Sequence, residues 1–251
     1  MIIINADDYG LDIKTNDAII ESFQKGFISS TTLMANMGGF DDACEKAKLY
    51  GLETSIGIHL NLTSGRPISE PIKSNRRFCD STGHFFRDRK SLYYLSRQDQ
   101  SDIYAEYSAQ IQRMKSSGII PTHIDSHHHF HTQLPLLSIV CRLAKSYQIP
   151  SIRLTRNCGE GISKVKRLYK YAVNNYIRAK GLSTLDYFGS VEDVIHLNQV
   201  QHNKLEIMVH PTYSIDGTLI DASNKSKMIE NYEKIRTKFM DMKLMNYGEI
   251  L

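Results

Sequence analysis

The chain has 251 residues, of which 41% are hydrophobic and 23% charged, so it is long and apolar enough to fold as a globular protein. Its formal net charge of +4 does not require an acidic partner such as nucleic acid, and no apolar run approaches the roughly 18 residues of a membrane-spanning helix. Four scattered cysteines form no Cys-x-x-Cys pair, and the first residues, which turn acidic at Asp7, do not resemble a signal peptide. We therefore expect a cytoplasmic protein that binds neither nucleic acid nor a membrane.

Short apolar runs alternate with amphipathic segments along the chain. The apolar runs predict strands at residues 1–5, 29–34, 54–60, 122–126, 150–154 and 205–209. The amphipathic segments predict helices at residues 14–25, 41–50, 99–117, 134–147, 164–180 and 225–240. Residues 185–188 and 192–200 are ambiguous, and residues 242–245 fit a last strand.

This alternation indicates βαβ units and a mostly parallel sheet. Seven or eight such units in 251 residues favour an α/β protein with a (β/α) barrel over one with an open sheet. No internal repeat or linker is visible, so residues 1–251 are expected to form a single domain. Residues 64–98 interrupt the pattern with prolines, glycines and five aromatic side chains, as expected of a lid or insertion loop.

Chemically useful side chains follow the predicted strands at the points where the strands end. In a parallel barrel the carboxyl ends of all strands open on one face, so residues far apart in sequence converge there. The side chains in question are those of Asp7, Asp8, His59, Asp125, His127, Arg153 and His210. Together they offer the carboxylates and imidazoles of a metal site or an acid–base site.

Residues 122–131 hold five of the ten histidines, with Asp125 among them. Imidazole is the commonest protein ligand of transition metals, so this density favours a metal or acid–base site over a set of unrelated surface histidines. If the segment is extended, side chains at alternate positions share one side. If the strand ends near residue 126, His127 and His131 lie about one helical turn apart instead.

Asp7 and Asp8 are adjacent carboxylates at the end of a buried strand, which is unfavourable unless a cation or hydrogen bonds offset their repulsion. One carboxylate can bind a metal while the other faces a water; the alternative is a turn in which an aspartate caps the next helix. His59 is either a ligand or a structural residue. His210 is held extended by Pro211 and is either a general acid or a capped strand end.

Five motifs, in this order, resemble the YdjC-like (ChbG-like) carbohydrate deacetylase family. They are Asn5-Ala6-Asp7-Asp8-Tyr9-Gly10, Ser30-Thr31-Thr32, Gly57-Ile58-His59-Leu60 with Leu62-Thr63, Thr122-His123-Ile124-Asp125-Ser126-His127-His128-His129, and Val209-His210-Pro211. The first and fourth motifs are the most specific, and the set covers most of the chain.

The resemblance implies a distorted (β/α) TIM-like barrel related to the polysaccharide deacetylases. It implies hydrolysis of the N-acetyl amide bond of an amino sugar in a small, chitin-derived oligosaccharide. It implies one divalent metal, magnesium in the family, held by Asp8, His59 and His127, with Asp7 as base and His210 as acid. A histidine-rich site is chemically better suited to zinc or another transition metal. The residues that remain for substrate contacts or for support of the ligands are Asp125, His129, His131 and Arg153.

Two other classes of function fit the same residues. Another metal-dependent hydrolase on this barrel, an amidohydrolase or a phosphoesterase, would also carry aspartate and histidine at its strand ends. A non-catalytic sugar-binding protein would need neither a base nor an acid, so Asp7 and His210 favour an enzyme. The expected partner is a small N-acetylated oligosaccharide. The sequence is compatible with a homodimer.

Overall fold

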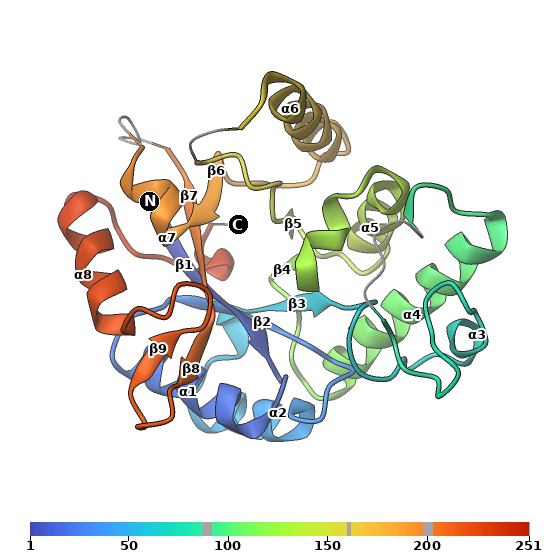
Figure 1. The fold of residues 1–251 in the computed structure, drawn as a ribbon, viewed down its shortest axis with the longest axis horizontal. Coiled ribbons are helices and arrows are strands. Elements are labelled where there is room, and N and C mark those ends of the chain that lie inside the picture. Colours follow the sequence, from blue (N-terminus) through green and yellow to red (C-terminus); the bar gives the residue numbers. More distant parts are fainter. Residues whose placement is uncertain (87–91, 160–161, 198–202, 251) are drawn as a thin grey trace.

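A parallel sheet of seven strands forms the centre of the protein (Figure 1). The computed structural model describes residues 1–86, 92–159, 162–197 and 203–250. The strands, in the spatial order β5-β4-β3-β2-β1-β7-β6, are β1 (Ile2–Tyr9), β2 (Ser30–Leu33), β3 (Ile56–Leu60), β4 (His123–Ser126), β5 (Ser151–Ile152), β6 (Tyr187–Ser190) and β7 (Leu205–Val209). Almost every strand residue is buried, as expected of a parallel sheet that is covered on both faces.

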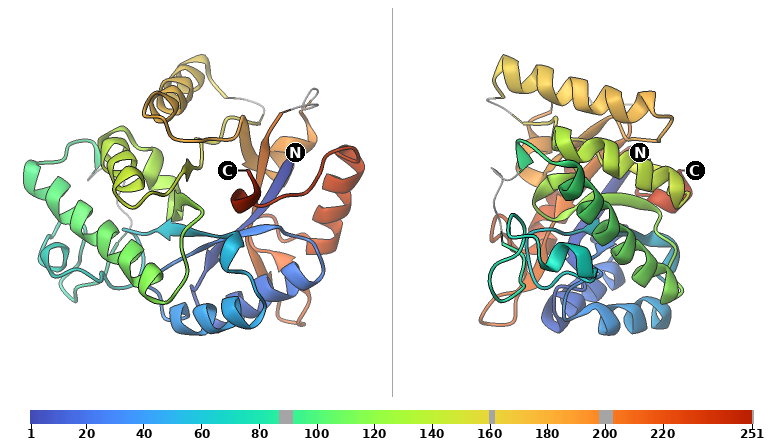
Figure 2. Two further views of the ribbon diagram at one scale, coloured as in Figure 1. Left: turned by 180° about the vertical axis from the view of Figure 1, so that it is seen from behind. Right: turned by 90° about the vertical axis from the view of Figure 1, so that its right-hand side faces the viewer.

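The sheet curls into a half-barrel whose two edges are β5 and β6 (Figures 1 and 2). Among the described residues, an isolated parallel bridge between Ser151 and Ser183 links the two sides. In this bridge the backbone N–H of Ile152 donates to the carbonyl of Ser183 at 3.1 Å. The predicted α/β class is confirmed, and the curled sheet is consistent with the predicted distorted (β/α) barrel. The barrel is not fully closed, because the two edge strands in the described part of the chain, β5 and β6, do not pair with each other.

Helices surround the curled sheet (Figure 2). They are α1 (Ile13–Gln24), α2 (Phe40–Leu49), α3 (Glu70–Lys73), α4 (Arg97–Ser116), α5 (Leu134–Ser146), α6 (Lys164–Ala179), α7 (Val191–Ile195) and α8 (Met228–Lys238), with 3-10 turns η1 (Glu53–Ser55), η3 (His127–Thr132) and η4 (Tyr247–Glu249). α4 starts at Arg97, ahead of the predicted Asp99, because Ser96 and Asp99 form a reciprocal capping box. No helix in the described part of the chain combines the length and apolar character needed to cross a membrane.

Two elements near the site differ from the expectation. β1 continues to Tyr9 instead of ending at Asn5, so Asp7 and Asp8 belong to the strand and not to a turn. After β7 the chain forms an antiparallel hairpin of β8 (Pro211–Tyr213) and β9 (Leu219–Asp221). The sequence did not predict this hairpin because strands of three residues are too short to show a period.

The structure also assigns the segments whose secondary structure was ambiguous in the sequence. Residues 185–188 contribute to β6, and residues 192–200 begin within α7, although residues 198–200 lie outside the described part of the chain. Residues 242–245 form no strand of their own: Leu244 makes an isolated parallel bridge with Ile2.

The first residues of the irregular segment 64–98 are hydrogen-bonded to α4. The fully buried carboxylate of Glu106 accepts hydrogen bonds from the backbone N–H groups of Ile68 at 3.0 Å and of Ser69 at 2.7 Å. These bonds hold the start of the segment against α4. The role of this segment as a lid stays a prediction, and its residues 87–91 lie outside the described part of the chain.

Candidate metal centre and active site

The two aspartates of β1 are placed by an irregularity in that strand. The pairing of β1 with β2 changes register between Ala6 and Tyr9, and Asp8 has a positive φ of 69°. A left-handed residue without glycine's freedom is strained, and such residues are typical of functional sites. The irregularity breaks the alternation of a regular strand, so Asp7 and Asp8 both come within reach of His59.

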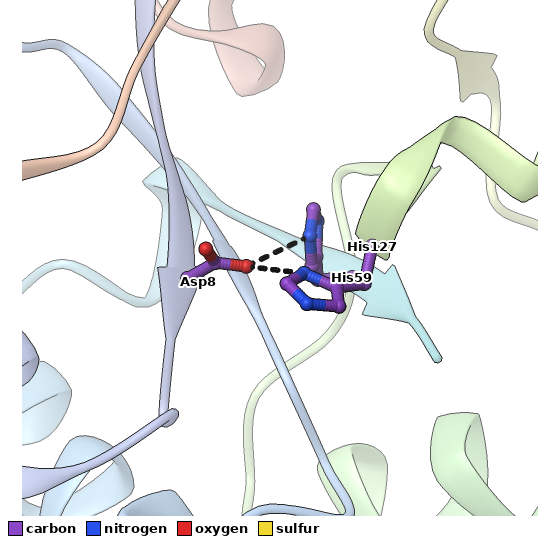
Figure 3. A group of neighbouring side chains, drawn as sticks. All are labelled: Asp8, His59 and His127. Carbon is purple, nitrogen blue, oxygen red and sulfur yellow. Dashed lines mark hydrogen bonds and ion pairs between the residues drawn. The ribbon is translucent and has the colours of Figure 1, made fainter. Parts of the chain in front are cut away.

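Asp8, His59 and His127 form a group of three candidate metal ligands (Figure 3). The Oδ1 atom of Asp8 lies 2.7 Å from Nδ1 of His127 and 3.2 Å from Nε2 of His59. His59 is deeply buried, with 2% of its side chain exposed, whereas Asp8 and His127 keep 16% and 17% exposed. The group therefore has a buried side and a side that a small molecule can reach.

Asp125 fixes the orientation of the His59 ring. Its Oδ1 accepts a hydrogen bond from Nδ1 of His59 at 2.7 Å, which leaves Nε2 directed to Asp8. The hydroxyl of Thr32 donates to the other oxygen of Asp125 at 3.1 Å. A carboxylate behind a histidine is the usual support of a metal-ligating imidazole. Burial alone would lower the pKa of His59, but Asp125 and Asp8 raise it to about 10, so this site strongly favours positive charge.

Arg153 lies at the centre of a second, fully buried cluster. Its two terminal nitrogens donate to the two oxygens of Asp7 at 2.8 Å and 2.7 Å, and its Nε donates to Glu206 at 2.7 Å. The guanidinium also pairs with Asp125. Burial would raise the pKa of Asp7, but Arg153 outweighs it and holds that pKa well below its usual range.

This cluster decides between two candidate metal groups. Asp7, His59 and Asp125 also bring ligand atoms close together. Their carboxylates, however, are already paired with Arg153, and His59 uses Nδ1 for Asp125. A cation among them would face a buried positive charge at close range. Among the described residues, no arginine pairs with the carboxylate of Asp8, so the group of Asp8, His59 and His127 is the better candidate for a metal site.

His210 follows directly after β7 and lies beside Asp7. Its Nε2 lies 3.9 Å from Oδ2 of Asp7, and 27% of its side chain is exposed. Asp221, at the end of β9, lies behind it: Oδ1 of Asp221 is 3.8 Å from Nδ1 of His210 and accepts the His210 backbone N–H at 3.2 Å. The hairpin thus brings a buried carboxylate to the far side of the imidazole.

The other histidines of the His-rich segment do not share one side. His128 and His129 have positive φ values of 57° and 58°, so η3 is kinked and the expected helical spacing of His127 and His131 fails. His131 is fully buried; its Nδ1 bonds the Ser126 hydroxyl at 2.7 Å and its Nε2 donates to the Arg153 carbonyl at 3.1 Å. It therefore cannot touch a substrate, and of the two predicted roles only support of the site fits.

His129 and His123 each pack against an aromatic ring. His129 packs edge-on against Phe188, with ring centroids 5.6 Å apart, and its Nδ1 is buried without a hydrogen-bond partner among the described residues. Burial and the nearby Arg153 lower the pKa of His129 to about 3, so it is neutral. His123 is a core residue: its ring fills the space beside Gly57, where a Cβ would come within 2.4 Å of it.

Three residues of this arrangement were missed by the sequence reasoning: Asp221, Glu206 and Tyr247. Glu206 carried a signal, because it is the one charged residue of the apolar strand β7, and a buried charge needs a partner. Tyr247, whose hydroxyl donates to Glu206 at 2.6 Å, carried none. Asp221 belongs to the hairpin that was not predicted.

Comparison with known proteins places these residues in a family. A family model described as "YdjC-like protein" matches residues 1–242. The chain belongs to the YdjC-like family. A carbohydrate deacetylase of Clostridium beijerinckii is 30% identical over 256 residues, which cover 99% of each chain. A carbohydrate deacetylase of Geobacillus stearothermophilus is 37% identical over 222 residues, covering 88% of this chain and 83% of its own. The expected family is confirmed, and with it the expectation of an enzyme.

Solved structures agree with the YdjC-like fold. A crystal structure of an Enterococcus faecalis protein, provisionally assigned to cellobiose-phosphate cleavage, superposes with a TM-score of 0.73. It is 25% identical in sequence, and the match covers 99% of this chain and 98% of that one. A lactam utilization protein from Thermus thermophilus reaches a TM-score of 0.51 at 13% identity, which shows a likeness of fold alone.

Proposed function

We propose that this YdjC-like protein is a metal-dependent hydrolase that removes an N-acetyl group from an amino sugar of a small, chitin-derived oligosaccharide and releases acetate. The observation that carries the proposal is the convergence of Asp8, His59 and His127 on a partly open site, directly beside the buried Asp7. The relatives named carbohydrate deacetylase supply the substrate class. A pure binding site would not require the Asp7 and His210 pair.

The residues present fit one divalent cation. One carboxylate oxygen and two imidazole nitrogens approach one another from three different strands or strand ends, and Asp125 orients one of the imidazoles from behind. Two nitrogen donors and one oxygen donor suit zinc or another transition metal better than magnesium, which prefers oxygen. When bound, such a cation supplies Lewis-acid polarisation of an amide carbonyl and acidifies water.

Asp7 is proposed as the general base. Arg153 keeps it ionised across the whole working range of pH, so it can accept a proton from an attacking water. The same ion pair makes Asp7 a weak base, and the proton transfer therefore requires water that is already acidified. The arginine also fixes both carboxylate oxygens, so the base has one orientation towards the reacting water.

His210 is proposed as the general acid. Water adds to the acetamide carbonyl carbon, the C–N bond then breaks, and the leaving nitrogen takes up a proton to depart as an amine. His210 is partly exposed and its Nε2 lies 3.9 Å from Oδ2 of Asp7, so acid and base can act on the same amide group. Asp221 lies behind the ring and holds His210 through the backbone N–H of that residue.

Other residues are proposed to contact the sugar. His129 is neutral and only half-buried, so it can exchange hydrogen bonds with a hydroxyl group. Tyr93 and Tyr94 of the segment 64–98 are 83% and 73% exposed. Aromatic side chains of this kind stack on the apolar faces of sugar rings, which agrees with the predicted lid.

The test is incubation of the protein with N-acetylated chitooligosaccharides and with a phosphorylated disaccharide, each with magnesium, zinc, manganese or cobalt. Mass spectrometry should show loss of an acetyl group, and an enzymatic acetate assay should show an equal amount of acetate. Release of phosphate without acetate would favour a phosphoesterase instead. Binding of the oligosaccharide without turnover under all metals would favour a sugar-binding protein.

A further inference from the structure

Viewed along the half-barrel, the C-terminal turn η4 lies within the outline of the curled sheet, at one of its ends (Figure 2). Tyr247 of this turn is 1% exposed and stacks on the ring of His123, with centroids 3.7 Å apart and ring planes 13° from parallel. The side chain of Asn246 donates to the Ser55 hydroxyl at 3.0 Å and ties the turn to the chain before β3. The turn therefore holds a fixed place at this end of the half-barrel, and the Tyr247 side chain is buried beneath it.

A continuous chain of hydrogen bonds leads from this turn to the proposed base. The hydroxyl of Tyr247 donates to Oε2 of Glu206 at 2.6 Å, and Oε1 of Glu206 accepts Nε of Arg153 at 2.7 Å. Arg153 in turn holds both oxygens of Asp7. All four residues are at most 2% exposed, so water does not compete for these bonds.

Glu206 is not needed to balance the charge of Arg153. Asp7 and Asp125 already pair with the guanidinium, and a further carboxylate in the same dry space adds repulsion. Burial raises the pKa of Glu206 to about 7 although Arg153 opposes the shift, which shows how unfavourable this charge is. The neighbours of Glu206 in β7 are apolar, so a Leu at this position would suit the strand better.

What Glu206 does provide is the third attachment of the guanidinium. Asp7 binds the edge formed by the two terminal nitrogens, and Glu206 binds the Nε on the adjacent edge. Because Asp7 and Glu206 bind different edges of the planar guanidinium, the group cannot rotate within the site. Tyr247 fixes the Glu206 carboxylate in turn, so the orientation of Asp7 depends on the C-terminal turn.

We propose that Glu206 and Tyr247 are positioning residues for deacetylation, which act through Arg153 on the alignment of Asp7. The proposal rests on the proposed base role of Asp7. Neither residue touches the metal ligands or reaches the exposed side of the site, so both act on the rate of the chemical step and not on binding. A misplacement of about 1 Å at a reacting group is enough for a loss of about 100-fold in rate.

The experiment compares Glu206→Leu with Glu206→Gln, and Tyr247→Phe with Tyr107→Phe. Tyr107 is a fully buried tyrosine of α4 whose hydroxyl has no hydrogen-bond partner among the described residues, so it controls for loss of a buried hydroxyl. We expect Glu206→Leu to lower kcat for acetate release about 10- to 100-fold, with KM and bound metal unchanged. Glu206→Gln keeps an oxygen for Nε and should lose less than about 5-fold, and Tyr247→Phe should lower kcat where Tyr107→Phe does not.

A double-mutant cycle separates positioning from a general structural role. In an Arg153→Lys background the Nε donor is absent, so Glu206→Leu should have no further effect on kcat. An equal loss in both backgrounds would overturn the proposal, as would an unchanged kcat in the folded Glu206→Leu protein. If Glu206→Leu does not fold, Tyr247→Phe in the two backgrounds decides in the same way. Full activity of Asp7→Asn would overturn the base assignment and with it this proposal, whereas an inactive Asp7→Asn together with an equal loss in both backgrounds would overturn the positioning role alone.

Discussion

Replacement of Arg153 by methionine is expected to destabilise the protein strongly. Arg153 is fully buried and bonds Asp7 and Glu206 at 2.7–2.8 Å while it also pairs with Asp125. Removal of one partner from a buried ion pair costs about 3–5 kcal/mol because a charge is left uncompensated. Three carboxylates are involved, so we expect the upper end of that range, a large part of a total stability of about 5–15 kcal/mol.

The loss of stability should depend on pH in a defined direction. In the wild type the pKa of Asp7 is depressed, so its pairing stabilises the fold above the unfolded value of about 3.9 and the gain is lost on acidification. In Arg153→Met burial is no longer offset by the arginine and raises the pKa of the carboxyls, as it already does for Glu206 at about 7. The difference in the free energy of unfolding between variant and wild type should therefore be largest above pH 7 and shrink towards pH 5.

Urea unfolding followed by circular dichroism at pH 5, 6, 7 and 8 measures this difference. Arg156→Met is the control, because Arg156 pairs with Asp193 while 44% of its side chain is exposed, and the expected loss is below about 1 kcal/mol. A difference for Arg153→Met that is under about 1 kcal/mol, or that is the same at all four pH values, would refute the assignment of Arg153 as the counterion of a buried carboxylate cluster.

Three further predictions concern the site. Asp7→Asn should keep its bound metal by mass spectrometry yet lose about 100-fold or more in acetate release, and retained activity would remove Asp7 from the role of base. His127→Ala should bind less metal at equal protein concentration, and an unchanged metal content would exclude His127 as a ligand. Asp221→Asn should lower kcat at least about 10-fold with KM unchanged, since it holds His210; a change in KM alone would point to a role in substrate binding.

The convergence of the site could be predicted from the sequence because it follows from strand direction. Asp8, His59 and His127 lie on or just after three parallel strands, and the carboxyl ends of such strands share one edge. The prediction tolerated errors in the strand ends. β1 extends four residues beyond its expected end at Asn5, yet the two aspartates still reach the edge of the sheet, because a change of register turns the chain at Asp8.

The features that the sequence did not reveal depend on very short strands or on contacts between residues that are far apart in the sequence. Asp221 is carried by a strand of three residues, and Tyr247 reaches Glu206 across 41 residues of sequence. The kink at His128 and His129 arises from left-handed backbone that only the folded environment imposes, so neither spacing rule for the His-rich segment applied. The open edge between β5 and β6 likewise reflects pairing choices that apolar runs do not specify.

The most direct test of the central proposal is a metal titration of acetate release. The protein is stripped of metal with a chelator, and acetate release from an N-acetylated chitooligosaccharide is measured as a divalent cation is added back. We predict no activity in the stripped protein and full activity at one cation per chain, with zinc or another transition metal at least as effective as magnesium. Acetate release that is equally fast in the stripped protein, or that never appears with any cation, would contradict the proposed metal-dependent deacetylation at Asp8, His59 and His127.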